Sequence, residues 1–186
     1  MIRVPTNRPP THPGEMLLEE FLRPMGISQR ELAKAIRMPY PRINELVNRH
    51  RGMTPQIALR LAKFFGLEAS FWMNLQLRWD LYHASQEAQN LFRGARGQRF
   101  ENGMESAFSR DLVSLVKKHG DVAVKAIAEI VLSEEAHAEV IGEALHWLGD
   151  IDDPKSYSSR LDLLEKSLKS PSPSVRDGAA LGIAFL

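Results

Sequence analysis

The sequence has no cysteine among its 186 residues. Disulfide bonds, thiolate metal ligands and cysteine nucleophiles are therefore excluded, and we expect a cytoplasmic protein. It also lacks any apolar run of about 18 residues, so we expect no transmembrane helix and no membrane partner. The first 14 residues, MIRVPTNRPPTHPG, have no apolar segment of the kind found in secretory signals, and no such signal is expected.

Catalytic patterns are equally scarce. None of the six histidines lies in an HExxH pattern, and no glycine-rich phosphate loop or nucleophile elbow is present. Glu134, His137 and Glu139 cluster on one expected helix, and His137 with Glu134 could bind a metal weakly, but a solvated acidic helix face is the favoured interpretation. The sequence therefore predicts no enzyme, no metal and no cofactor.

Apolar residues make up 44% of the chain and charged residues 25%, which is enough for a packed core and typical of a globular protein. The net charge of +1 is unevenly distributed. Residues 1–90 hold 12 Lys and Arg against 8 Asp and Glu, whereas residues 91–186 hold 12 against 15. This asymmetry favours a nucleic acid at the first half and another partner at the second, although ordinary fluctuation also explains it.

Residues 28–48, SQRELAKAIRMPYPRINELVN, predict two short helices joined by a sharp corner. Ser28 and Glu31 have the spacing of a capping box at the start of the first helix. Met38 precedes a proline and therefore avoids helical angles, while Pro39 or Pro41 suits the first turn of the second helix. Such a pair, with a polar outer face on the second helix, is typical of a helix-turn-helix.

Further helices flank this pair. One is expected to begin at Pro13 and to be stopped by Pro24 and Gly26, a fourth follows Thr54, and a fifth begins near Ser70. The sequence thus predicts a compact all-α domain of five helices over residues 1–88.

Residues 89–103, with three glycines, three arginines and few apolar side chains, predict a linker, with contact to phosphate as an alternative. Residues 104–186 predict a second, helical domain with helices near 104–119, 121–132, 134–149, 155–169 and 173–186. Gly142, Ala144 and Leu145 recur 36 residues later as Gly178, Ala180 and Leu181. This spacing favours a HEAT-like solenoid, and an irregular helical bundle is the alternative.

The N-terminal half resembles the HigA antitoxins, a branch of the Cro/repressor-type (XRE) helix-turn-helix proteins. The resemblance covers roughly residues 10–85 and rests on three ordered blocks: HPGEMLLEEFLRPMGISQRELAKAI, RINELVNRHRGMTPQIALRLAKFFG and FWMNLQLRWDL. It implies a dimeric, operator-binding antitoxin that neutralises a small ribosome-dependent mRNA-cleaving toxin and represses the operon of the pair. The acidic balance of residues 91–186 favours a basic partner protein such as this toxin. About 95 residues follow the part that resembles the family.

If the second helix of the pair enters the major groove, its exposed side chains meet base edges. Arg42 suits guanine, Asn44 suits adenine, Glu45 can accept from cytosine, and Tyr40 can contact a thymine methyl. The expected backbone contacts are Gln29, Asn48, Arg49 and Arg51.

Three aromatic residues of the fifth helix, Phe71, Trp72 and Trp79, are candidates for a dimer or partner surface, with the domain core as the alternative. Two further functions stay open. The chain could be a transcription regulator without a toxin, whose helical tail binds a protein or small effector. It could also be a scaffold in which the helix-turn-helix packs rather than binds.

Overall fold

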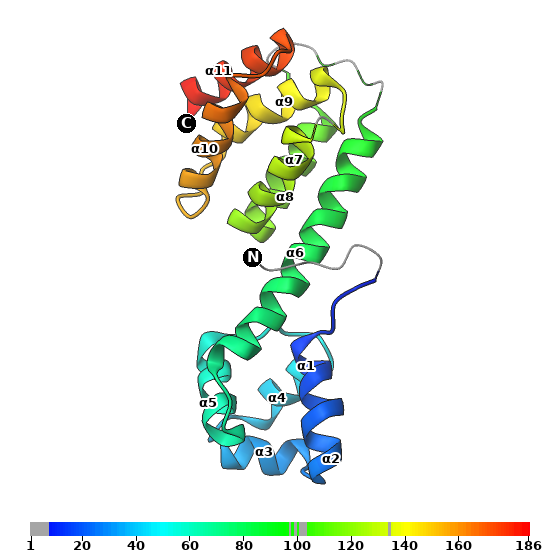
Figure 1. Cartoon of the computed structure of the whole chain (residues 1–186), viewed down its shortest axis with the longest axis vertical. Coiled ribbons are helices and arrows are strands. Elements are labelled where there is room, and N and C mark those ends of the chain that lie inside the picture. Colours follow the sequence, from blue (N-terminus) through cyan, green and yellow to red (C-terminus); the bar gives the residue numbers. More distant parts are fainter. Residues whose placement is uncertain (1–7, 97, 99, 101–103, 134) are drawn as a thin grey trace. The chain divides into compact units, whose positions relative to one another are not determined.

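Helices are the only regular elements in the computed structural model, which describes residues 8–96, 98, 100, 104–133 and 135–186 (Figure 1). The described helices fall into two units, Met1–Tyr82 and His83–Leu186. The all-α prediction is confirmed. None of the helices within these described ranges is long and apolar enough to cross a membrane.

The first unit begins with one helical run made of α1 (Pro13–Met16), the π-helical turn η1 (Leu17–Leu22) and α2 (Arg23–Met25). Gly26 ends this run in a left-handed conformation with φ of 66°, as glycine does most easily. Pro24 does not stop the helix as expected. It lies in the first turn of α2, where the wider π-helical hydrogen bonding, with the Arg23 N–H donating to the Leu18 carbonyl, accommodates it.

The helix-turn-helix pair consists of α3 (Gln29–Ala35) and α4 (Tyr40–Val47). The capping box is confirmed, because the Glu31 N–H donates to Ser28 Oγ at 3.2 Å and the Ser28 N–H donates to Glu31 Oε2 at 2.8 Å. Pro41 lies in the first turn of α4, where a missing N–H is tolerated. α5 (Pro55–Phe65) and α6 (Ala69–Gly94) complete the five expected helices.

The core of the first unit fixes α4 against α1. A Cβ atom on Gly14 would lie 1.8 Å from the Leu46 carbonyl oxygen, so only glycine allows this approach of the two backbones. The largest fully buried side chains of this core are Leu17, Leu22, Leu32, Ile43, Leu46, Ile57, Leu61 and Trp72. This packing determines which side of the helix-turn-helix remains exposed.

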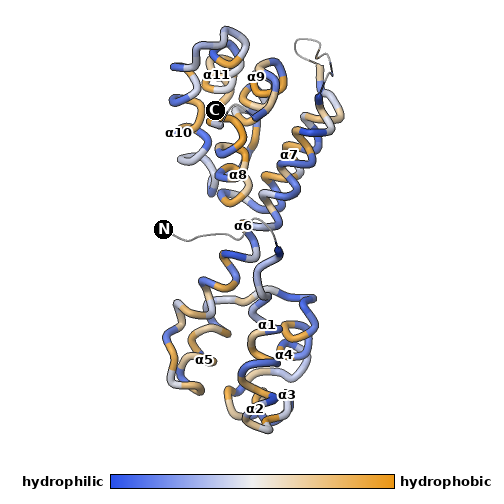
Figure 2. The backbone as a smooth tube through the Cα atoms, turned by 45° about the vertical axis from the view of Figure 1, so that its right-hand side comes forward, coloured by the Kyte–Doolittle hydropathy of each residue, from blue (hydrophilic) through white to orange (hydrophobic). Residues whose placement is uncertain are grey.

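The second unit contains α7 (Ala107–His119), α8 (Asp121–Leu132), α9 (Ala138–Gly149), α10 (Tyr157–Ser167) and α11 (Pro173–Phe185). Hydrophobic positions recur along α8 and α9 (Figure 2), which supply much of its core. α11 packs mainly on α9, and α10 contacts α8, α9 and α11. The helix positions agree closely with those expected, whereas the HEAT-like assignment stays a prediction.

The predicted linker differs from the structure in its first part. Residues 89–94 continue α6, and Phe92 and Ala95 are buried in the core of the second unit. The reason is that two apolar side chains, at helical spacing from Ala84 and Ala88, extend one buried stripe of the helix. Residues 97, 99 and 101–103 of this segment lie outside the described residues. The proposed domain limits of 1–88 and 104–186 stay predictions.

Candidate nucleic-acid interface

The corner of the helix-turn-helix is held by a residue of another helix. α3 ends at Ala35 with Ile36 as its C-terminal cap, and Arg37 adopts a left-handed conformation with φ of 54°. The Met38 N–H then donates to the Ala33 carbonyl at 2.8 Å, which closes the helix end. Arg60 of α5 donates from Nη1 to the carbonyls of Ile36 (2.8 Å) and Arg37 (2.5 Å). These bonds set the angle at which α4 leaves α3.

A side-chain network joins the outer faces of the two helices. The Asn44 amide nitrogen donates to Gln29 Oε1 at 3.1 Å and to the Tyr40 hydroxyl at 3.3 Å. The guanidinium of Arg30 lies over the Tyr40 ring, 5.3 Å from its centroid. Arg30 is absent from the expected set of contact residues, although it follows Gln29 directly in the first turn of α3. The four side chains form one polar surface built from both helices.

Arg42 differs from the other expected base-reading residues because its side chain is not engaged within the described residues. It is exposed in the first turn of α4, and its side chain has no hydrogen bond or ion pair among the described residues. A guanidinium placed there can form two parallel hydrogen bonds to guanine O6 and N7. Asn48, at the C-terminal end of α4, is also exposed, as the expected backbone contact requires.

The remaining expected contacts are paired within the protein. Arg51 Nε lies 2.8 Å from Glu45 Oε2. This ion pair would have to open before the Glu45 carboxylate could accept a hydrogen bond from cytosine. Arg49 Nη2 lies 3.0 Å from Glu15 Oε2, and its backbone is left-handed, with φ of 62°. Both ion pairs are exposed and therefore weak enough to exchange for phosphate.

Gln29 Oε1 accepts from Asn44, whereas the side-chain nitrogen of Gln29 can still donate, so its expected phosphate contact stays a prediction. At the same helix end, the hydrogen bonds from the Ser28 side chain and backbone lower the pKa of Glu31. An ionised Glu31 stabilises the N-terminus of α3 and also places a negative charge where a phosphate would approach. The side chains of Arg30 and Arg49 are therefore better suited than the backbone N–H groups at the start of α3 to hold the nucleic-acid backbone.

The three aromatic candidates for a partner surface differ in how far the fold buries them. Trp72 has no exposed surface and packs against Phe21 and Phe65, so its assignment to a partner surface is wrong. Helical spacing alone does not reveal which side of α6 faces the core. Trp79 is partly buried, with its ring 4.9 Å from that of His12. Phe71 is 36% exposed and remains a candidate.

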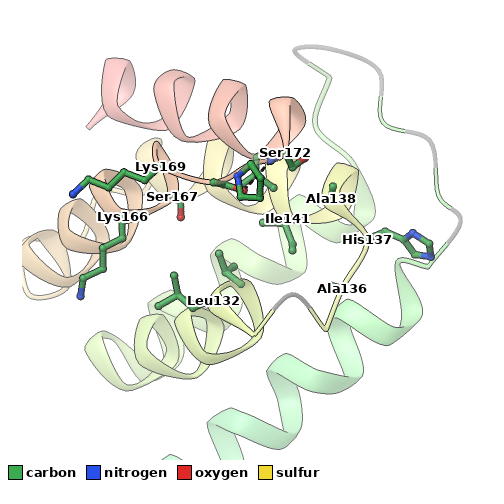
Figure 3. A pocket seen from close by; sticks show the side chains of 13 residues that line it. Leu132, Ala136, His137, Ala138, Ile141, Lys166, Ser167, Lys169 and Ser172 are labelled. Carbon is green, nitrogen blue, oxygen red and sulfur yellow. Dashed lines mark hydrogen bonds between the residues drawn. The ribbon is translucent and has the colours of Figure 1, made fainter.

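The second unit contains a pocket of about 410 Å³ where the end of α8 and the start of α9 meet the residues between α10 and α11 (Figure 3). Leu132, Ile141 and Val175 give it apolar walls. Lys166 and Lys169 extend away from these walls on the outer side of the pocket (Figure 3).

The weak metal-site candidate lies at the start of α9. His137 precedes this helix and is exposed, as is Glu139, whereas Glu134 lies outside the described residues. No group of three or more metal-ligating side chains is found in the part of the chain that the structure describes.

Comparison with known proteins agrees with this geometry. A family model described as "Helix-turn-helix" matches residues 18–72. Virulence-associated protein I of Dichelobacter nodosus is 48% identical over 83 residues, which are 45% of this chain and 77% of that protein. Antitoxin HigA-1 of Vibrio cholerae is 39% identical over 77 residues, which are 41% of this chain and 72% of that protein. This chain belongs to the HigA-type helix-turn-helix family.

The HigA-type chain is thus a DNA-binding regulator. Among solved structures, the antitoxin HigA of Pseudomonas aeruginosa with the higBA promoter is 35% identical to it. That match covers 51% of this chain and 99% of the other, with a TM-score of 0.44. About half of this HigA-type chain lies outside each of the three matches.

Proposed function

We propose that this protein is the antitoxin of a toxin–antitoxin pair, which binds its operator sequence-specifically, represses its own operon and neutralises a small basic mRNA-cleaving toxin. The observation that carries the DNA-binding part is the polar surface of Gln29, Arg30, Tyr40 and Asn44 beside the exposed Arg42. The antitoxin part is supported by the 39% identity with Antitoxin HigA-1.

In this function α4 occupies the major groove. Arg42 reads a guanine, while Asn44 and Tyr40 meet neighbouring bases. Arg30, Asn48 and Arg49 hold the backbone on either side of the groove. The basic balance of residues 1–90 favours this approach over long distances.

A second copy of the chain is the proposed partner at another surface of the first unit. Phe64, Leu67 and Phe71 are 38%, 38% and 36% exposed around the connection from α5 to α6. Exposed aromatic and aliphatic side chains that lie close together are typical of interfaces. A homodimer would present two copies of α4 to two half-sites of an operator.

Binding to the operator is tested by a gel-shift titration with DNA from upstream of the gene. We expect Arg42→Ala to weaken binding by roughly 1–3 kcal/mol and to relax the preference at one base pair. Lys63→Ala, an exposed residue of α5, is the matched control and should bind as the wild type does. Equal binding by wild type and Arg42→Ala would remove Arg42 from the interface.

Neutralisation is tested by inducing each neighbouring gene that encodes a short basic protein, with and without co-expression of this protein. We expect one neighbour to arrest growth and this protein to restore it. Arg42→Ala should restore growth equally well, because neutralisation needs toxin contact rather than operator contact. Failure to restore growth against any toxic neighbour would remove the antitoxin role while leaving DNA binding intact.

The second candidate is a regulator without a toxin, whose helical tail binds a protein or small effector. The pocket at the end of α8 favours it, because its volume and apolar walls suit a small ligand or an inserted side chain. The two candidates differ in the growth test, since only the antitoxin rescues growth.

A further inference from the structure

Asn44 uses both hydrogens of its side-chain amide within the protein. One is donated to Gln29 Oε1 at 3.1 Å and the other to the Tyr40 hydroxyl at 3.3 Å. An asparagine amide carries two hydrogens on nitrogen, so none remains for another acceptor. Asn44 Oδ1 accepts no hydrogen bond among the described residues, and the residue is only partly buried.

The backbone of Gln29 and the ring of Tyr40 are positioned by contacts that do not involve Asn44. Gln29 is the first residue of α3, directly after the capping residue Ser28, whose bonds with Glu31 fix that helix end. Tyr40 begins α4 and has the Arg30 guanidinium over its ring. The amide nitrogen of Asn44 is therefore oriented toward α3 by contacts from two helices.

This orientation changes what Asn44 can read. A bidentate contact with adenine needs the amide nitrogen for N7 and the amide oxygen for the N6 amino group. With the nitrogen committed, only the oxygen remains. An acceptor alone meets the N6 amino group of adenine and the N4 amino group of cytosine equally well.

We propose that Asn44 reads DNA as a hydrogen-bond acceptor only, selecting adenine or cytosine over guanine or thymine at one position, with Gln29 and Tyr40 as the residues that determine this specificity. The inference rests on the proposed binding of α4 in the major groove. It replaces the adenine-specific contact expected from the sequence with a preference for either base that carries an exocyclic amino group.

The first experiment selects binding sites from a random duplex library with the full-length protein. Asn44→Ala identifies the position that Asn44 reads, because preference is lost there alone. At that position we expect the wild type to retain adenine and cytosine about equally. The double variant Gln29→Ala/Tyr40→Phe frees the amide and should prefer adenine over cytosine roughly tenfold. Gln29→Glu keeps an acceptor for Asn44 and should preserve the wild-type base ratio, whatever its added charge does to affinity.

The second experiment places 7-deazaadenine, which lacks N7, at the same position and measures affinity by fluorescence anisotropy. We expect little change for the wild type and a roughly tenfold loss for the double variant. Unchanged melting temperatures would show that the variants fold. A wild type that selects adenine alone and loses affinity without N7 would overturn the inference, as would an Asn44→Ala variant that keeps every preference. Absence of any sequence-specific binding by the wild type would instead overturn the proposed operator binding, and the inference with it.

Discussion

Gly142 of α9 and Gly178 of α11 meet with no side chain between them. A Cβ atom on Gly178 would lie 2.1 Å from the Gly142 carbonyl oxygen. A second close approach joins the same helices, because a Cβ on Gly149 would lie 1.9 Å from the Gly182 carbonyl oxygen. These two contacts let α9 and α11 pack backbone to backbone, and the first of them joins the two glycines that are 36 residues apart in the internal repeat.

Gly178→Ala is therefore expected to force α11 away from α9 and to destabilise the second unit by about 1–3 kcal/mol. Denaturant unfolding followed by circular dichroism measures this cost. Gly94→Ala in α6 is the matched control, because a Cβ there would have no atom within 4 Å. It should be neutral or slightly stabilising, since alanine favours a helix more than glycine does. Equal stability of the two variants would contradict the close packing of α9 and α11.

Arg60→Met is expected to loosen the corner between α3 and α4. Methionine keeps much of the apolar stem but cannot donate to the carbonyls of Ile36 and Arg37, and we expect a loss of about 2 kcal/mol in the first unit. DNA affinity should fall as well, because the angle of α4 is less well defined. Arg78→Met, an exposed position on α6, removes the same charge without touching the corner. If both variants lose stability and affinity alike, charge rather than positioning explains the effect.

Arg49→Gly should separate stability from DNA binding. Arg49 is left-handed, with φ of 62°, a conformation that costs about 1–2 kcal/mol more for most side chains than for glycine. Its exposed ion pair with Glu15 contributes little against that cost. We expect a more stable protein that binds every DNA sequence more weakly, with a salt dependence flatter by about one unit. Arg49→Ala, which retains the strain, should weaken DNA binding without the gain in stability.

Glu87 is expected to make the second unit sensitive to acid. Burial alone would raise its pKa, but hydrogen bonds from Lys118 Nζ (2.7 Å) and His119 Nε2 (3.1 Å) lower the pKa below its ordinary value of 4.5. Because the folded pKa is the lower one, the stabilisation is complete above pH 4.5 and is lost as the pH falls through the folded value.

Glu87→Gln should therefore lower the melting temperature at neutral pH, modestly because the side chain is 41% exposed. The difference from the wild type should shrink as the pH falls below 4.5. Glu165→Gln, an exposed position on α10, serves as the control and should show no such pH dependence. A constant difference at all pH values would mean that the charge of Glu87 does not act through Lys118 and His119.

Local chemistry made several elements predictable. The capping box of Ser28 and Glu31, the place of Pro41 in the first turn of α4 and the glycine end at Gly26 each depend on residues within a few positions of one another. α8 and α11 begin at the residues expected for the same reason. The candidate DNA-reading residues share one motif that the sequence marks clearly, and their contacts with DNA stay predictions.

The roles of those residues were not predictable. Asn44 and Gln29 lie 15 positions apart, and only the packing of α3 against α4 brings the amide nitrogen of one to the oxygen of the other. Glu45 is paired with Arg51, and Trp72 belongs to the core rather than to a partner surface. Each of these outcomes depends on which side chains the folded chain brings together, and residue spacing alone leaves that undetermined.

The sequence by itself determined that this chain is helical, that residues 28–48 form a helix-turn-helix and that Arg42 lies on the exposed side of its second helix. Hydrogen bonding within a helix and the restrictions imposed by proline and glycine act over four or five residues, so they can be read directly from the chain. The tertiary structure decided that α6 continues through residues 89–94, that Gly142 meets Gly178 and that Asn44 retains only an acceptor. Those features depend on which surfaces bury one another, and burial is a property of the packed molecule.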